Sequence, residues 1–294
     1  MTMKIVAVQP SSSVPVIFEE LFTEGCPEGQ LFMRVAQVPG PVRAEVVLTH
    51  GLGEHSARYG HVARALGESG FRLWAYDMRA HGRSPGRRGD VPDYDLFLSD
   101  LECAIQQVPA TDAPIFLMGH SMGAQITLNY LLRRNGRIQG AVIASPWLRL
   151  AFRPARWRLA LARLALFIWP GFRQPTPKDW TRLSRDIDHL AALPGLELMH
   201  HLLSARLYFA LTQAGESAIA EAPRLRTPVF LLHGGEDLVT SMEATREFFE
   251  RAGAADKAFK VYPEARHETH NDLCRDQVLR DIVGWLEARV DGSK

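Results

Sequence analysis

A serine with a glycine on either side, two positions away, is the first candidate for chemistry in this chain. Residues 119–123 read Gly-His-Ser-Met-Gly, and the serine is Ser121. An apolar run precedes this motif, and apolar residues at helical spacing follow it. A strand, a tight turn and a helix form the context in which such a serine exposes its hydroxyl as a nucleophile. The alternative interpretation is a serine that only caps a helix in a glycine-rich turn.

A serine hydroxyl is a weak nucleophile, so it needs an imidazole to take its proton and a carboxylate to orient that imidazole. On a strand–turn–helix scaffold these partners follow in the order acid, then histidine. Asp237 follows the apolar run 228–234, and His267 follows the run 257–262. Both would lie at the C-terminal ends of strands, where open α/β sheets build their sites.

Each partner has a rival beside it in the sequence. Glu236 precedes Asp237. An Asp-x-Val pattern after His-Gly recurs in proteins that carry such a serine on a strand–turn–helix scaffold, and this favours Asp237. His270 lies three residues after His267, and we favour His267 because it comes sooner after the last strand. Either rival could be an ordinary loop residue.

Such a nucleophile also needs two N–H groups aimed at the oxyanion that forms during attack. One should be the backbone N–H of Met122, the residue after the serine. The other should come from the loop 50–53, which follows a predicted strand at 45–50, and Leu52 is the expected donor.

The elements that must position these groups alternate along the chain. Strands are predicted at 45–50, 71–77, 114–118, 140–146, 228–234 and 257–262, and helices at 58–69, 94–107, 124–132, 241–251 and 278–286. Alternation of this kind predicts an α/β fold with a mostly parallel central sheet flanked by helices. A further strand at 31–35 is expected to pair with 18–23, and residues 1–20 are expected to be a loose lead-in.

The alternation stops between residues 147 and 223, where only helical segments are predicted. This segment predicts a helical cap inserted after the sixth strand, between core segments 1–146 and 224–294. As far as residue 182 it combines bulky apolar residues with a run of arginines, namely Arg149, Arg153, Arg156, Arg158, Arg163, Arg173 and Arg182. The cap is either a packed insert with solvated arginines or a lid whose outer surface touches lipid, because arginine stems can lie on apolar surface while their heads meet phosphates.

Composition narrows the remaining classes. The net charge of +1 gives no overall attraction to nucleic acid or to an anionic membrane. Cys26, Cys103 and Cys274 are far apart and lack C-x-x-C spacing, so we expect reduced thiols in a cytoplasmic protein, without a disulfide framework, a zinc site or a cofactor. Residues 1–20 do not look like a signal peptide, and no apolar run has the length of a membrane span.

With these motifs in view, the chain resembles the monoacylglycerol lipase and lysophospholipase branch of the α/β-hydrolases, also called the serine aminopeptidase S33 or hydrolase-4 group. The matching segments are HGLGEHS at 50–56, YDMRAHGRS at 76–84, GHSMGA at 119–124, HGGED at 233–237 and HETH at 267–270. Two segments depart from the family pattern: Ala80 stands where a glycine is usual, and residues 187–190 lack the usual Asp-Pro.

The resemblance implies roles for specific residues. It makes Ser121 the nucleophile, Asp237 the orienting acid and His267 the base. It also implies that Glu54, Arg58 and His270 hold the glycerol end of the substrate. Glu54 and Arg58 could instead form a structural ion pair beside the loop.

The expected activity is therefore hydrolysis of monoacylglycerol, or of a similar single-chain lipid ester, to fatty acid and glycerol through an acyl-enzyme. A lysophospholipase and a general carboxylesterase are the alternatives within the same chemistry. A non-catalytic binding protein of the same fold is the alternative outside it, although such proteins usually lack a member of the triad. Peripheral contact with a membrane through the cap is also expected.

Overall fold

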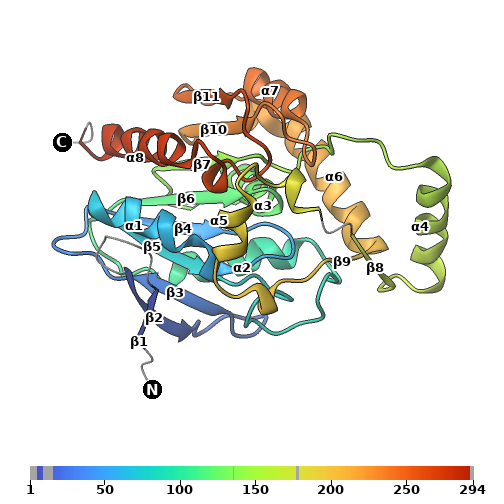
Figure 1. The fold of residues 1–294 in the computed structure, drawn as a ribbon, viewed down its shortest axis with the longest axis horizontal. Helices are drawn as coiled ribbons and strands as arrows, with labels where there is room; N and C mark the ends of the chain where they lie inside the picture. Colours follow the sequence, from blue (N-terminus) through green and yellow to red (C-terminus); the bar gives the residue numbers. More distant parts are fainter. Residues whose placement is uncertain (1–4, 9–15, 135, 177–178, 292–294) are drawn as a thin grey trace.

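One nine-stranded sheet runs through the molecule (Figure 1), in the order β1-β2-β3-β5-β4-β6-β7-β10-β11. The computed structural model describes residues 5–8, 16–134, 136–176 and 179–291. The six strands from β5 to β11 run parallel, and the three N-terminal strands join them as an antiparallel extension. The strands are β1 (Ile5–Val8), β2 (Val16–Phe22), β3 (Phe32–Ala36), β4 (Ala44–Thr49), β5 (Phe71–Tyr76), β6 (Ile115–His120), β7 (Gly140–Ala144), β10 (Val229–Gly234) and β11 (Lys257–Tyr262).

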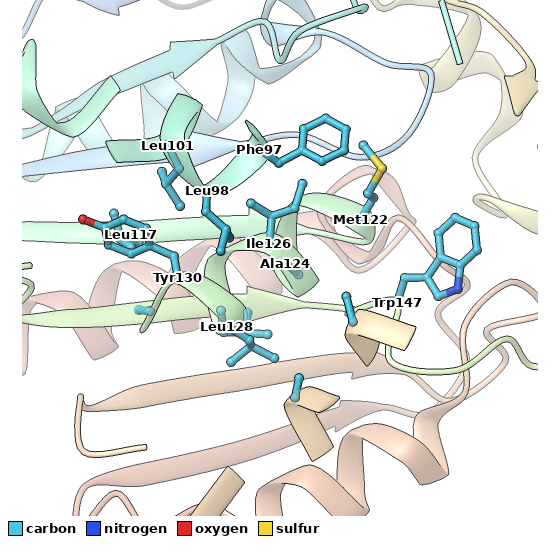
Figure 2. Close-up of a cluster of buried hydrophobic side chains, with 14 of the residues drawn as sticks. Phe97, Leu98, Leu101, Leu117, Met122, Ala124, Ile126, Leu128, Tyr130 and Trp147 are labelled. Atoms are coloured by element: carbon cyan, nitrogen blue, oxygen red, sulfur yellow. The ribbon is translucent and has the colours of Figure 1, made fainter. Parts of the chain in front are cut away.

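Helices cover both faces of this sheet because its central strands are apolar on both sides. The helices are α1 (Gly60–Glu68), α2 (Asp95–Gln106), α3 (Met122–Arg133), α4 (Arg156–Ile168), α5 (Ile187–Ala192), α6 (Ala205–Glu221), α7 (Met242–Arg251) and α8 (Arg275–Asp291). Side chains of α1 and α8 share one buried cluster, while α2, α3, α6 and α7 contribute to the other. Figure 2 shows α2 and α3 meeting over β6 in the second cluster. The mostly parallel α/β fold predicted from the sequence is confirmed.

The N-terminal strands change the strand count. β2 pairs with β3 in the expected place, with Phe18 opposite Ala36. β1 also pairs with β2, so the expectation of a loose lead-in was wrong for residues 5–8. Three of its four residues are Ile or Val, which favour strands. The remainder of that prediction, residues 9–15, lies outside the described residues. The insertion consequently follows the seventh strand, β7, rather than the sixth.

The segment between β7 and β10 is not wholly helical. Its strands β8 (Arg173–Pro175) and β9 (Leu202–Ser204) pair antiparallel, which local periodicity could not reveal in three-residue strands. α6 buries Leu207, Leu211 and Ala218 in the main core. By contrast, α4 buries none of its residues and lies at the outer edge of the molecule (Figure 1). Among the helices of the described residues, none combines the length and apolarity that crossing a membrane requires.

Two of the three cysteines form a disulfide, which corrects the expectation of reduced thiols. Cys26, in the β2–β3 connection, is bonded to Cys103 on α2, with their Cα atoms 5.6 Å apart. The neighbouring Gln107 side chain bonds both the N–H and the carbonyl of Glu24, which holds that connection against α2. The sequence gave no sign of this contact because the two cysteines are 77 residues apart. Cys274 is a free thiol. The thiol-based reason for expecting a cytoplasmic protein therefore no longer applies.

Candidate active site

Ser121 occupies the sharp turn between β6 and α3. Its backbone lies at φ 54° and ψ −116°, a conformation that side-chain-bearing residues rarely adopt. Its N–H donates to the Ala144 carbonyl at 2.9 Å, and its own carbonyl accepts from Trp147 N at 3.0 Å. A Cβ on Gly123 would lie 2.1 Å from the Thr49 carbonyl oxygen, so the turn requires glycine there. Two backbone hydrogen bonds, from the end of β7 and from the residue Trp147 beyond it, thus hold the serine in its strained turn.

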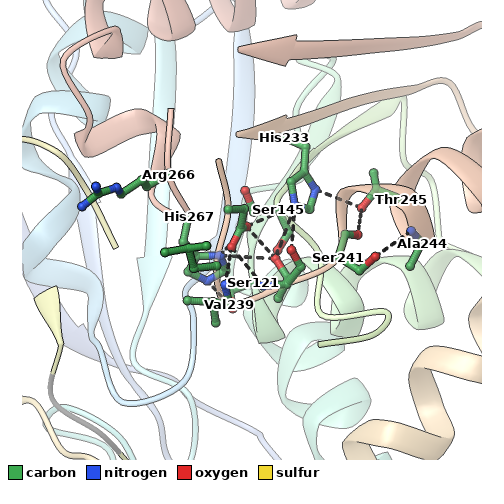
Figure 3. A network of polar contacts seen from close by, with 12 residues as sticks. Ser121, Ser145, His233, Val239, Ser241, Ala244, Thr245, Arg266 and His267 are labelled. Atoms are coloured by element: carbon green, nitrogen blue, oxygen red, sulfur yellow. Dashed lines mark hydrogen bonds and ion pairs between the residues drawn. The ribbon is translucent and has the colours of Figure 1, made fainter. Parts of the chain in front are cut away.

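Three predicted residues meet beyond the C-terminal ends of β6, β10 and β11, and Figure 3 labels two of them, Ser121 and His267. The Ser121 hydroxyl lies 2.9 Å from His267 Nε2, and His267 Nδ1 lies 2.8 Å from Asp237 Oδ2. Ser121 is only 6% exposed and His267 only 3%. With the proton of the imidazole on Nδ1, Ser121 Oγ–H donates to Nε2. This chain of hydrogen bonds can accept the serine proton and stabilise the imidazolium that results.

Asp237 is held as a carboxylate by five donors. Oδ1 accepts from the backbone N–H groups of Val239 and Thr240, at 2.7 and 2.9 Å. Oδ2 accepts from Thr240 Oγ1 at 2.8 Å, from His233 Nε2 at 3.1 Å and from His267 Nδ1. Burial alone would raise the pKa of Asp237, but His267 and His233 hold this pKa well below its usual value. The rival Glu236 is exposed to solvent.

The two expected oxyanion donors belong to the turn that carries Ser121 and to the loop after β4. Met122 begins α3, where the first N–H groups of the helix have no partner within the helix. Leu52 follows β4 and lines the same cavity as Ser121. His50 Nε2 accepts from Met78 N at 3.0 Å, so its Nδ1 carries the proton and donates to the Gly51 carbonyl at 2.8 Å. His50 therefore fixes the loop that carries Leu52.

The residues expected at the glycerol end are not equally placed. Glu54 lines the cavity, whereas Arg58 and His270 lie behind its wall, both nearly fully buried. Arg58 Nε lies 3.2 Å from Glu54 Oε2, and its Nη2 lies 2.7 Å from Glu268 Oε2. Burial opposes the charge of Arg58, but the two carboxylates raise its pKa. His270 stacks on Tyr59, and burial and His120 hold the pKa of His270 well below its usual value. The structural ion pair considered from the sequence is thus present.

The cavity in front of Ser121 has a lining of two chemical kinds. Its volume is about 290 Å³. The catalytic loops contribute polar groups, which are Glu54, His120, His267 and Glu268. The residues between β7 and α6, with Tyr208 on α6, contribute bulky apolar side chains, which include Trp147, Leu150, Phe152, Leu183, Leu203 and Tyr208, and also the polar Thr176, Asp179, Arg182, His200 and His201. This lining suits a molecule that has both a polar and an apolar part.

Several residues of the site were missed from the sequence. Glu268 directly follows the histidine, and His120 directly precedes the serine, so adjacency to a triad member was the signal available for both. His233 and Thr240 support Asp237 and lie within four residues of it. In the described part of the chain no cluster of three or more side chains could hold a metal ion.

Ala80, which stands where the resemblance led us to expect glycine, adopts φ 62°. Its loop is fixed by Asp77, whose carboxylate accepts from Ser56 N and Arg83 N at 2.7 Å each. The departure from the family pattern therefore leaves an alanine in a left-handed conformation that favours glycine.

The sheet order, the serine in its strained turn and the serine–histidine–aspartate hydrogen bonds define an α/β-hydrolase. The family model described as "Serine aminopeptidase, S33" (Hydrolase_4) matches residues 40–274. The chain belongs to this family and is a serine hydrolase.

Three known proteins illustrate the relationship. The monoacylglycerol lipase of Mycolicibacterium smegmatis is 32% identical over 253 residues, which cover 84% of this chain and 89% of that protein. The crystal structure of the Paleococcus ferrophilus monoacylglycerol lipase superposes with a TM-score of 0.80 at 32% identity, over 89% of this chain and all of that one. A Dictyostelium discoideum abhydrolase domain-containing protein is 31% identical over 253 residues, and there the match covers only 27% of the longer protein.

Proposed function

We propose that this protein hydrolyses monoacylglycerol to a free fatty acid and glycerol. Ser121 Oγ attacks the ester carbonyl carbon while His267 Nε2 takes the hydroxyl proton and Asp237 stabilises the imidazolium. The N–H groups of Leu52 and Met122 donate to the oxyanion. His267 then gives the proton to the departing glycerol oxygen, which leaves an acyl-enzyme on Ser121. Water, deprotonated by His267, attacks this ester, and the fatty acid leaves as Ser121 regains its proton.

One observation carries this proposal: the cavity in front of Ser121 joins polar groups of the catalytic loops to bulky apolar side chains from the segment after β7. A monoacylglycerol likewise joins hydroxyls beside its ester to a long apolar chain. Buried polar groups left without partners would disfavour esters that lack those hydroxyls. Of the expected contacts, Glu54 lines the cavity directly, while Arg58 and His270 would act through the wall behind it. Relatives of comparable length carry the name monoacylglycerol lipase.

A substrate panel tests the proposal. Wild type and Ser121→Ala are compared on a monoacylglycerol, a lysophospholipid and a p-nitrophenyl ester of the same acyl chain, with a fluorophosphonate probe to label the nucleophile. We expect a higher kcat/KM on monoacylglycerol than on lysophospholipid, labelling of wild type, and loss of activity and labelling in Ser121→Ala while thermal unfolding is retained. A preference for lysophospholipid would establish that alternative instead, and activity confined to the activated p-nitrophenyl ester would favour a general carboxylesterase. Absence of labelling in wild type would favour a binding protein.

We further propose that residues 147–223 act as a cap that docks on anionic membranes through α4. Phe167, Ile168 and Trp157 on or beside this helix are 89%, 75% and 62% exposed. Apolar side chains in such numbers on one surface mark an interaction site. Arg153, Arg156, Arg158 and Arg163 lie exposed among them. Arg149 does not belong to this surface, because it pairs with Glu216 and Glu247.

Co-sedimentation with vesicles tests this docking. The test variant replaces four exposed arginines on or beside α4 by Gln. The control variant replaces four other exposed arginines by Gln, so that both variants lose four positive charges. We expect wild type to bind anionic vesicles more than zwitterionic ones and less as salt rises, because the Debye length shrinks to about 3 Å at 1 M. The control should match wild type and the α4 variant should bind less. Equal binding by all three proteins would leave the cap as a lid with solvated arginines. The test variant is Arg153, Arg156, Arg158 and Arg163→Gln, and the control is Arg134, Arg137, Arg246 and Arg280→Gln.

A further inference from the structure

His120 is a buried histidine beside the nucleophile for which the hydrolysis mechanism has so far given no role. It is only 2% exposed and lines the cavity in front of Ser121. Its Nδ1 lies 2.9 Å from Glu54 Oε1, and its Nε2 lies 3.4 Å from the His267 carbonyl oxygen. Each ring nitrogen therefore faces an oxygen. A neutral imidazole has only one N–H. Whether either of those two oxygens can donate a hydrogen bond therefore decides the protonation state of the ring.

Both oxygens can only accept. The His267 oxygen is a backbone carbonyl. Glu54 accepts from Gly51 N at 2.5 Å and Tyr59 OH at 3.0 Å on Oε1, and from Arg58 Nε at 3.2 Å on Oε2. Burial would raise the pKa of Glu54, but His120 and Arg58 hold this pKa well below its usual value. A carboxylate with these donors is ionised, so His120 satisfies both oxygens only when each of its ring nitrogens carries a proton.

The charges around the ring lead to the same state. Glu54 and Glu268 are two buried carboxylates, and Arg58 supplies one cation between them. A protonated His120 supplies the second cation and leaves the cluster neutral. Burial alone would lower the pKa of His120, but its hydrogen bond to Glu54 and the nearby carboxylates raise this pKa. The titratable and charged groups that face the ring are Glu54, Glu268, Arg58, His50, His267 and His270.

We propose that His120 is a positioning residue, a buried imidazolium that joins the oxyanion loop to the loop of the general base. Through Glu54 it holds Gly51 N–H, next to the expected donor Leu52, and through its Nε2 it holds the His267 backbone. The inference rests on the proposed hydrolysis, because it assigns His120 to that same site. Deprotonation of the ring would place a lone pair against the His267 carbonyl and leave one carboxylate uncompensated. Hydrolysis should therefore weaken as pH rises through the raised pKa of His120.

The ionisation state can be measured without any substrate. Nitrogen-15 NMR of the histidine rings in the whole protein is recorded at pH 6.5, and the His120 signals are assigned by their loss in a variant. We expect both ring nitrogens of His120 to carry a proton. One protonated and one bare nitrogen at this pH would overturn the inference, whatever the enzyme hydrolyses.

The pH profile of kcat/KM on monoacylglycerol tests the positioning role. His120→Asn keeps a donor near the Nδ1 position and His120→Gln keeps one near Nε2, but neither titrates. Misplacement of reacting groups by an ångström can lower rates by about 100-fold, so we expect kcat/KM to fall by roughly 10- to 100-fold in both variants. Both should also lose the decline at alkaline pH. If both kept that decline, His120 would not be its source and the inference would fail.

A matched control separates this role from the loss of any buried histidine. His61 lies behind the cavity, where its Nε2 contacts the His270 carbonyl, and burial and His189 lower its pKa to about 3. His61→Gln should therefore keep the alkaline decline of wild type. Thermal unfolding checks that all variants fold. A wild type that does not hydrolyse monoacylglycerol would refute the proposed function, whereas the NMR result alone decides the state of His120.

Discussion

Replacing Asp237 by asparagine should prevent His267 from acting as the base without disturbing the shape of the site. Oδ1 accepts two backbone N–H groups, from Val239 and Thr240, so only the carbonyl oxygen of the new amide fits that side. The amide NH₂ is then forced to the side of Oδ2, where it points at His267 Nδ1. The imidazole must accept there, and its proton moves to Nε2, facing Ser121. A histidine in this tautomer cannot take the serine proton.

The size of the effect follows from that tautomer. Loss of the correct tautomer in a serine–histidine–aspartate site costs about 10⁴ in kcat, which corresponds to about 5 kcal/mol of transition-state stabilisation. The assay is kcat on a p-nitrophenyl ester, beside the exposed neighbour Glu236→Gln as control. We expect the control to change kcat by less than about twofold, as surface substitutions usually do little. Comparable losses in both variants, or a loss only in Glu236→Gln, would refute the assignment of the acid.

Three further outcomes are expected. Reducing the Cys26–Cys103 bond, or replacing both cysteines by alanine, should lower the free energy of unfolding by about 4 kcal/mol, because the bond closes a loop with a sequence separation of 77. Chemical denaturation measures this free energy. An unchanged value would mean that the bond does not form. Ala80→Gly should raise that free energy by roughly 0.5–1 kcal/mol, because φ 62° favours glycine, and a lower denaturation midpoint would contradict this. Arg58→Met should lower the free energy of unfolding by about 3 kcal/mol or more, because it leaves a buried carboxylate unpaired. It should also reduce hydrolysis of monoacylglycerol and of a p-nitrophenyl ester alike. A loss confined to monoacylglycerol would instead indicate direct contact with glycerol.

The triad could be located from the sequence because each member lies at or soon after the end of a predicted strand. Ser121 directly follows β6, while Asp237 and His267 lie in the loops after β10 and β11, and parallel strands bring their C-terminal ends to one edge. The longer strands and helices of the core were predictable because local periodicity carries them, whereas the short strands β1, β8 and β9 were not.

Contacts between distant segments were not predictable in the same way. Glu268 pairs with Arg58 across 210 residues, and Cys26 with Cys103 across 77, and neither pair leaves a local pattern. The arginines between 147 and 223 looked alike in the sequence, yet only the fold separates the paired Arg149 from the exposed Arg156. The side-chain partners of His120 likewise depend on three loops meeting.

The hydrogen bond between Trp147 and the nucleophile has a mechanical consequence for the cap. Trp147 N–H holds the Ser121 carbonyl, and four residues later Ala151 N–H holds the carbonyl of Val239 in the loop of the acid. The first residues after β7 are thus fixed to the loops of the nucleophile and of the acid. The same segment also reaches the loop of the base further along, where the Glu268 N–H donates to the Leu183 carbonyl at 2.7 Å. Helix α4 lies between these attachment points, so its replacement by a helix of another shape would leave all three hydrogen bonds in place.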